Sequence, residues 1–168
     1  MDYEGLDIAI AAMKEIPDAT LIIVGDGVAR PGLEDLADEL DLNDRVVFTG
    51  KQPATDIHLW YAALDVFVVP RRDVEVCRKV TPLKPLQAMA CGVPVIGTDL
   101  PALKEITGGL MVEVEPDNPS ALAKSVDLVR QGELIVNPRE LEEWAKKRSW
   151  ERNAHSLEGL YLELLRGR

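Results

Sequence analysis

Apolar residues recur along the chain at two alternating spacings. Segments in which apolar side chains return every three or four residues alternate with short, continuous runs of β-branched residues. The first spacing is typical of a helix with one buried face, and the second of a strand that is covered on both faces. The pattern predicts helices at 6–16, 32–42, 55–63, 82–90, 101–106, 119–130, 137–148 and 150–166, and strands at 20–24, 45–48, 65–69, 93–97 and 110–114.

This alternation predicts an α/β fold. Short buried strands separated by helices form parallel βαβ units with right-handed crossovers, so we expect a Rossmann-like parallel sheet with helices on both faces. A length of 168 residues suits one domain. We therefore expect a single domain over 1–168, with 150–166 as its closing C-terminal helix.

The chain starts on a predicted helix, whereas a doubly wound sheet usually starts on a strand that is often central. Either the fold starts differently here, or the preceding strand lies in a missing part of a larger parent protein. We favour the second interpretation. An open position in the sheet would then predict strand exchange or a dimer with a second copy.

Charge and composition narrow the possible partners. The net charge is -10, so the surface as a whole repels nucleic acids and anionic lipids. No apolar run is long enough for a transmembrane segment, and the N-terminus carries acidic residues where a signal peptide carries basic ones. Cys77 and Cys91 form no CxxC pair, and His58 and His155 are far apart, so we expect reduced thiols, a cytoplasmic protein and no metal site.

Ligands of open α/β sheets bind beyond the carboxyl ends of the strands, so the loops at those ends are the candidate sites. Gly25-Asp26-Gly27 follows the first predicted strand, and its glycines allow a tight turn and close approach of a ligand. The plainer interpretation is a simple turn. Lys51 follows the second strand and lies either over a base or in solvent.

The loop after the third strand carries the strongest signal. Within residues 71–84, five basic side chains outnumber two acidic ones: Arg71, Arg72, Arg78, Lys79 and Lys84 against Asp73 and Glu75. This local positive charge favours an anionic ligand, and the alternative is a solvated basic loop.

The next predicted helix adds a phosphate-binding geometry. Thr81 is suited to cap it and Pro82 to occupy its first position. The N–H groups of Leu83 and Lys84 would then point outward from a positive helix end, where Lys84 and Lys79 add full charges.

The run VTPLKPLQAMACGVPVIGTDLPALKEI closely resembles the donor-site segment of the retaining glycosyltransferases of family four, which have the two-domain GT-B fold. LIIVGDG, DRVVFTG, YAALDVFVVP and GGLMVEVEPDNPSALA match the family in order and spacing. SWERNAHSLEGLYLEL resembles the family's closing helix, which crosses back to the other domain. The resemblance covers essentially the whole chain.

The resemblance implies the C-terminal half of such an enzyme, which binds a UDP- or GDP-sugar donor without a metal or other cofactor. The acceptor site belongs to a missing N-terminal domain, so we expect the isolated domain to be inactive. By position, the implied donor-binding residues are Gly25, Asp26, Gly27, Lys51, Thr81, Pro82, Leu83 and Gln87, and the implied catalytic residues are Lys79 and Lys84.

The sequence departs from the family pattern in two places. The family's paired glutamates would fall at 79 and 87, where this chain has Lys79 and Gln87. Gln87 can still hydrogen-bond a ribose hydroxyl, with less strength than a carboxylate. The family's phosphate-binding arginine would precede Met1, and Glu4 stands near the position of its usual lysine.

Three other functions stay open at this point. The first is a non-catalytic module that binds nucleotide sugars through a weakened site. A GT-B-like sugar-nucleotide epimerase fragment is less favoured, because the loops offer no acid/base pair. The last is a flavodoxin-like domain without a particular ligand.

Overall fold

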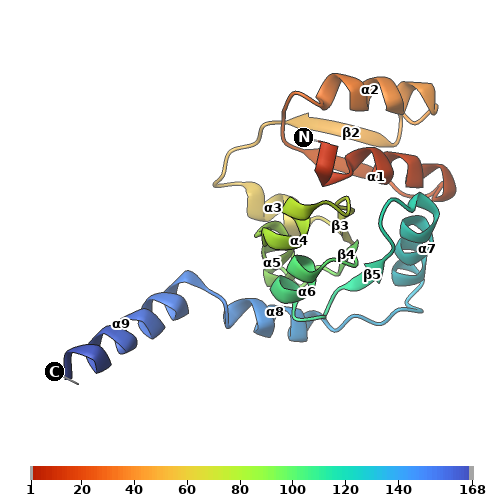
Figure 1. Cartoon of the computed structure of the whole chain (residues 1–168). Coiled ribbons are helices and arrows are strands. Elements are labelled where there is room, and N and C mark those ends of the chain that lie inside the picture. Colours follow the sequence, from red (N-terminus) through yellow and green to blue (C-terminus); the bar gives the residue numbers. More distant parts are fainter. Residues whose placement is uncertain (1, 167–168) are drawn as a thin grey trace.

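The computed structural model of the chain describes residues 2–166 and contains the predicted helices and strands in the predicted order, together with one further helix, Glu75–Lys79 (Figure 1). Its strands are β1 (Leu21–Val24), β2 (Val46–Gly50), β3 (Phe67–Val69), β4 (Val95–Thr98) and β5 (Val112–Val114). Its α-helices are α1 (Leu6–Ala12), α2 (Arg30–Glu39), α3 (Ile57–Ala62), α4 (Glu75–Lys79), α5 (Lys84–Ala90), α6 (Pro101–Thr107), α7 (Pro119–Arg130), α8 (Pro138–Lys146) and α9 (Trp150–Arg166). Two 3₁₀ turns, η1 (Asp2–Glu4) and η2 (Met13–Glu15), flank α1.

All strand pairs are parallel, as predicted, but the described strands form two sheets. One sheet has the order β1-β2 and the other β3-β4-β5. Leu21 pairs with Val46 in the first sheet, and Phe67 pairs with Val95 in the second. The expected parallel α/β fold is confirmed, and the division into two sheets is an addition that the pattern did not predict.

Helix α1 fixes the relative direction of the two sheets. At its start, a Cβ built on Gly5 would lie 1.9 Å from the carbonyl oxygen of Pro70, the residue after β3. At its other end, Arg45, just before β2, donates to the carbonyl oxygens of Met13 and Ile16 at 2.9 and 2.8 Å. One end of α1 therefore meets the end of β3 and the other meets the start of β2, so all five strands point the same way.

The edges of β1 and β3 that face away from their paired neighbours carry no partner strand among the described residues. A strand between them would give the sheet the order 3-2-1-4-5-6 that is common in dinucleotide-binding folds. The strand that we expect before the first helix would occupy this position. The expectation itself stays a prediction.

The β3-β4-β5 sheet is buried on both faces, which explains why its strands are continuous apolar runs. Val95 packs in a cluster with residues of α5, α6 and α8, and its neighbour Ile96 packs in a second cluster with residues of α1 and α7. A third cluster joins Ile10 of α1 to α2 and β2. Burial of a side chain such as Ile96 stabilises the fold by about 1.5–3 kcal/mol.

The ends of three helices are defined by local contacts and backbone geometry. Asn118 caps α7 by accepting from the N–H of Ala121 at 2.9 Å, and Gly92 follows α5 with a left-handed φ of 72°. Leu100 is the N-cap residue of α6, and the preceding Asp99 pairs with Lys104 at 2.8 Å.

The predicted start of α5 is wrong. The helix begins at Lys84 with Leu83 as its N-cap, so Thr81 is not the cap and Pro82 is not the first helical residue. Pro85, in the first turn, provides the competing start signal, because a proline there loses no intrahelical hydrogen bond. The loop before it also contains α4, which the apolar periodicity did not predict.

Helix α9 stands away from the rest of the molecule, as Figure 1 shows. None of its residues is buried. No helix within residues 2–166 combines the length and the hydropathy that crossing a bilayer requires.

Candidate functional site

The loops after the five strands share one side of the molecule, because the strands are parallel and α1 holds the two sheets in the same direction. This is the side on which parallel α/β sheets bind ligands. A surface hollow of about 410 Å³ lies elsewhere, at the amino ends of β3 and β4, where it is lined by Asp65, Val66 and Pro94. Fold topology therefore argues against that hollow as the principal site.

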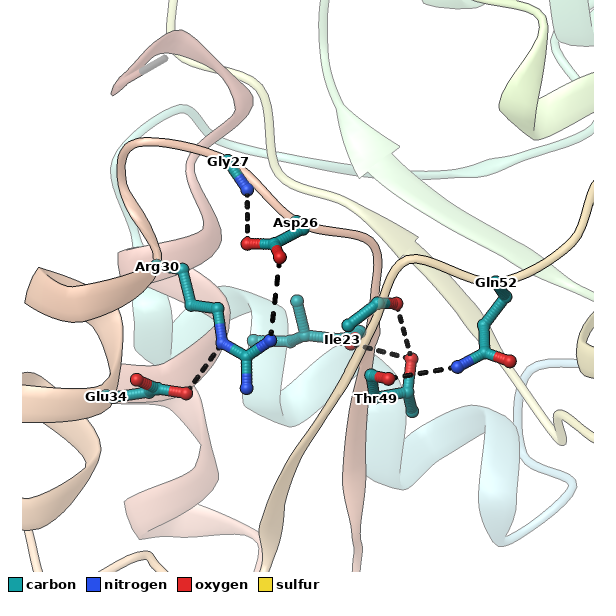
Figure 2. A network of polar contacts seen from close by, with 8 residues as sticks. Ile23, Asp26, Gly27, Arg30, Glu34, Thr49 and Gln52 are labelled. Atoms are coloured by element: carbon teal, nitrogen blue, oxygen red, sulfur yellow. Dashed lines mark hydrogen bonds and ion pairs between the residues drawn. The ribbon is translucent and has the colours of Figure 1, made fainter.

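The loop after β1 is held by a bond within the loop and by Arg30 of α2 (Figure 2), and its first residue is bonded to the end of β2. Gly25 donates from its N–H to the carbonyl oxygen of Gly50 at 3.0 Å, and Gly27 donates from its N–H to Oδ1 of Asp26 at 2.8 Å. The Asp26 carboxylate also faces Arg30 at 3.9 Å. The space beside Gly25 and Gly27 is open, since a Cβ on either glycine would meet no atom within 4 Å.

The loop after β2 lies beside the loop Gly25-Asp26-Gly27, called here the glycine loop (Figure 2). Thr49 donates from its hydroxyl to the carbonyl oxygen of Gly50 at 3.1 Å, and Gln52 donates to the carbonyl oxygen of Thr49 at 2.9 Å. These bonds give the turn a fixed shape. Lys51, which lies between Gly50 and Gln52, is exposed to solvent.

Arg71, two residues after the end of β3, is only 7% exposed. Its Nη1 donates to the carbonyl oxygen of Val80 at 3.1 Å, its Nη2 donates to Oε1 of Glu4 at 2.9 Å, and its Cζ lies 5.9 Å from the centre of the Tyr3 ring. Its Nε is buried without a hydrogen-bond partner among the described residues. A buried guanidinium of this kind needs an anion beside it, and Glu4 is that anion.

Glu4 joins this buried arginine to the start of α5. Its Oε2 lies 3.3 Å from Nζ of Lys84, whose side chain is 59% exposed. Burial raises the pKa of Glu4, but the hydrogen bonds and charges of Arg71 and Lys84 outweigh burial, so its pKa lies below the usual value. The carboxylate is therefore ionised at neutral pH.

The local excess of positive charge expected in this loop is cancelled by carboxylates from other parts of the chain. Arg72 pairs with Asp7 and Asp117, which lie far from it in sequence. The complete set contains five cations, Arg71, Arg72, Arg78, Lys79 and Lys84, and five carboxylates, Glu4, Asp7, Asp73, Glu75 and Asp117. Three of these acids, Glu4, Asp7 and Asp117, lie outside residues 71–84 in the sequence, and only the fold brings them close.

The predicted residues at 79–84 do not all share one environment. Lys79 is 72% exposed and binds Glu75 at 2.6 Å within α4. Thr81 is half-buried, Pro82 is buried, and Leu83 is 55% exposed at the N-cap of α5. Of the two predicted catalytic lysines, Lys84 is the one whose ion-pair partner, Glu4, also pairs with the buried Arg71.

Gln87 accepts a hydrogen bond on its Oε1 from the hydroxyl of Tyr61 at 3.1 Å. Burial, with a smaller contribution from Cys91, raises the pKa of Tyr61, so its hydroxyl stays protonated and can donate. This bond fixes the orientation of the Gln87 amide and leaves its N–H₂ group as the donor for any further partner.

The structure adds Tyr61 to the residues of interest and joins Arg71 to Glu4 in one ion pair. The charge of Arg71 was visible in the sequence, but its burial and its bond to Glu4, across 67 positions, were not. No signal in the sequence pointed to Tyr61. Within the described residues, no three His, Cys, Asp or Glu side chains gather in a way that could hold a metal ion.

Comparisons with known proteins find relatives over most of the chain. The family model described as "Glycosyl transferases group 1" matches residues 1–147. An uncharacterized glycosyltransferase of Methanocaldococcus jannaschii is 31% identical over 167 residues, which cover 94% of this chain and 41% of that protein. The GDP-mannose-dependent alpha-(1-6)-phosphatidylinositol monomannoside mannosyltransferase of Mycolicibacterium smegmatis is 32% identical over 148 residues, which cover 81% of this chain and 36% of that protein. The chain thus spans about two fifths of the length of these relatives.

Solved structures share the fold over the whole chain. Sucrose-phosphate synthase from Thermosynechococcus elongatus superposes with a TM-score of 0.85 at 27% identity, over 100% of this chain and 44% of that one. HepE from Anabaena in complex with UDP-glucose superposes with a TM-score of 0.80 at 22% identity, over 96% of this chain and 46% of that one. At 22% identity, the similarity to HepE shows a shared fold only.

Proposed function

Because this chain belongs to the group 1 glycosyltransferases and forms a C-terminal domain of the GT-B type, we propose that it holds the sugar-nucleotide donor for a two-domain retaining enzyme. The acceptor site and the other wall of the cleft then belong to an N-terminal domain of the parent protein. The isolated chain would bind the donor without transferring its sugar.

The observation that carries this proposal is the cation pair at the carboxyl ends of the strands. Arg71 and Lys84 meet on one carboxylate, at 2.9 and 3.3 Å, on the side where parallel sheets bind ligands. GDP-mannose and UDP-glucose, named for two of the similar proteins, share a diphosphate. A diphosphate is the part of either donor that two neighbouring cations would bind.

The remaining residues take roles from their position in this arrangement. The open space at Gly25 and Gly27 would let the donor approach the backbone closely, and exposed Lys51 would lie over the base. Leu83 would offer its backbone N–H to the diphosphate, and the oriented amide of Gln87 would donate to a ribose hydroxyl.

Transfer of the sugar would place growing negative charge on the departing diphosphate. Cations that are already fixed by the fold stabilise such charge more in the transition state than in the ground state. In the parent enzyme this role would fall to Lys84, supported by Arg71. Lys79 would first have to leave Glu75 before it could take part.

That pairing of Lys79 favours a second candidate, a module that binds the donor without supporting transfer. Lys79 stands where the family has a glutamate, and its 72% exposed side chain is engaged within its own helix. The two candidates agree on binding and differ only in turnover by the parent protein.

A cytoplasmic location belongs to the same proposal. Both Cys77 and Cys91 are free thiols, which accords with a reducing compartment. Nucleotide sugars that serve as donors would have to be available there.

Calorimetric titration of the chain with UDP, GDP, ADP and their sugars tests donor binding. We expect one nucleotide to bind with a dissociation constant between micromolar and millimolar. The substitution Lys84→Ala should weaken that binding about threefold to tenfold, because it removes one charge-assisted contact to the diphosphate.

The matched control is Lys146→Ala, which removes another exposed lysine that is paired with a glutamate, Glu142 at 3.6 Å, within helix α8 and outside the cluster of ion pairs around Arg71. It should leave the affinity unchanged. Indifference of the chain to every nucleotide, or an equal loss in both variants, would remove the donor site from this position.

A further inference from the structure

Glu4 has the geometry of a bound anion within the proposed donor site. Its two carboxylate oxygens are divided between two cations, with Oε1 on Arg71 at 2.9 Å and Oε2 on Lys84 at 3.3 Å. Two oxygens of a phosphoryl group would bridge a guanidinium and an ammonium group in the same way. The side chain of Glu4 is 24% exposed, so solvent and a ligand can reach it from one side.

The surrounding contacts hold Glu4 in this position. The carbonyl oxygen of Tyr3 accepts from the N–H of Arg72 at 2.9 Å, which ties η1 to the loop after β3. Gly5 lies against Pro70 so closely that no side chain would fit between them. The N-terminal turn is thus fixed on both sides of Glu4, and the carboxylate is delivered to the cations by the fold.

Because it is negatively charged, the Glu4 carboxylate competes with any ligand phosphate for Arg71 and Lys84. The five cations of this region are matched by five carboxylates, so a diphosphate that arrives meets no net positive charge. Of these carboxylates, Glu4 alone contacts both Arg71 and Lys84. Its low pKa keeps it charged throughout the neutral range.

We infer that Glu4 is a built-in counter-anion of the donor site, and that a nucleoside diphosphate gains Arg71 and Lys84 only by displacing its carboxylate. This rests on the proposed donor binding and assigns Glu4 as the residue that limits its strength. The N-terminal turn thereby sets the affinity of the site for diphosphates.

The test compares the chain with its Glu4→Gln variant in titrations with UDP, GDP and inorganic pyrophosphate. Glutamine keeps an oxygen that can accept from Arg71 but removes the negative charge. The variant should bind these diphosphates about tenfold more tightly, because the competing charge is gone. Thermal unfolding followed by near-UV circular dichroism confirms that the variant is folded.

The matched control is Glu142→Gln, which removes the same charge from a glutamate that pairs with Lys146 on α8. It changes the net charge equally and should leave diphosphate affinity unchanged. An equal gain in both variants would mean that only overall charge matters, and unchanged or weaker binding in Glu4→Gln would overturn the inference. Binding by neither the chain nor the variant would instead count against the proposed donor site itself.

A measurement on the unmodified chain follows the Glu4 carboxylate directly, and the variant serves only to assign its resonance. Carbon-13 NMR of the side-chain carboxyl groups, with Glu4 assigned through Glu4→Gln, should show the Glu4 resonance moving as pyrophosphate saturates the protein. A resonance that stays in place while pyrophosphate binds would contradict displacement of the carboxylate.

Discussion

At the scale of single residues, Gly5 sets the position of the N-terminal turn. Its φ of 68° is left-handed, and a Cβ there would lie 1.9 Å from the carbonyl oxygen of Pro70 and 2.9 Å from the carbonyl carbon. Both atoms belong to the backbone, so neither can yield as a flexible side chain would. Because Glu4 precedes this glycine, the placement of the carboxylate depends on this close approach.

We therefore expect Gly5→Ala to lower the free energy of unfolding by about 3 kcal/mol, since it adds a steric clash to the strain of a left-handed alanine. Urea unfolding followed by circular dichroism measures this loss. The control is Gly132→Ala, where φ is 72° but no atom lies within 4 Å of the added Cβ. Its cost should be only about 1–2 kcal/mol, which is the strain alone. Equal costs at both positions would contradict the close packing of Gly5 on Pro70.

At the scale of elements, the division of the strands into two sheets leaves alternate amides unpaired. Leu21 donates from its N–H to the carbonyl oxygen of Arg45, just before β2, at 2.8 Å, and Gly25 donates to that of Gly50, at the end of β2, at 3.0 Å. The N–H groups of Ile22 and Val24 therefore point to the other edge of β1. Phe67 donates to Pro94, so the N–H of Val68 likewise points away from β4. These edges are suited to pair with a further strand, from a preceding segment of a parent protein or from a second copy.

Hydrogen exchange measured by NMR should therefore alternate along β1. We expect the amide of Ile22 to exchange at least about tenfold faster than that of Ile23, which points toward β2. A dilution series provides the control, because pairing between copies would slow Ile22 only at high concentration. Equal protection of both amides in dilute protein would mean that the edge is already paired.

At the scale of the whole molecule, α9 differs from every other long helix. Helix α8 buries Leu141 and Ala145 against α5, and its Trp144 donates from Nε1 to the carbonyl oxygen of Ile106 at 2.8 Å. Helix α9 buries none of its residues and exposes a row of large apolar side chains: Trp150, Leu157, Leu160, Tyr161, Leu162, Leu164 and Leu165. Such a helix gains its stability from a partner surface, which the family resemblance predicts to be the other domain.

Removal of residues 150–168 should accordingly change the melting temperature by less than about 2 °C, because α9, the described part of this segment, contributes no buried side chain. Removal of residues 137–168, which also deletes α8, should lower it by about 10 °C or more, since Leu141 is 1% exposed in the core. Differential scanning calorimetry compares the two truncations. A large loss from the shorter truncation would show that α9 packs on the domain in solution.

Sequence patterns predicted the elements well and the polar contacts poorly. Strands such as β4 are short apolar runs whose burial on both faces follows from their composition, so their existence and parallel pairing could be predicted. The start of α5 was misplaced because Pro82 and Pro85 are both acceptable near a helix N-terminus, and only packing chooses between them. Whether Lys84, Gln87 and the glycine loop bind a donor stays a prediction.

The sequence by itself determined the order of the strands and of the helices other than α4, the parallel α/β class and the family, because these depend on local periodicity and on matching residues in order along the chain. Only the tertiary structure decided which charges meet. Glu4, Asp7 and Asp117 reach the basic loop after β3 from positions far away in the chain, and they turn a region of apparent positive charge into a neutral one. The physical reason is that electrostatic energy depends on distance in space, which no window of the sequence contains.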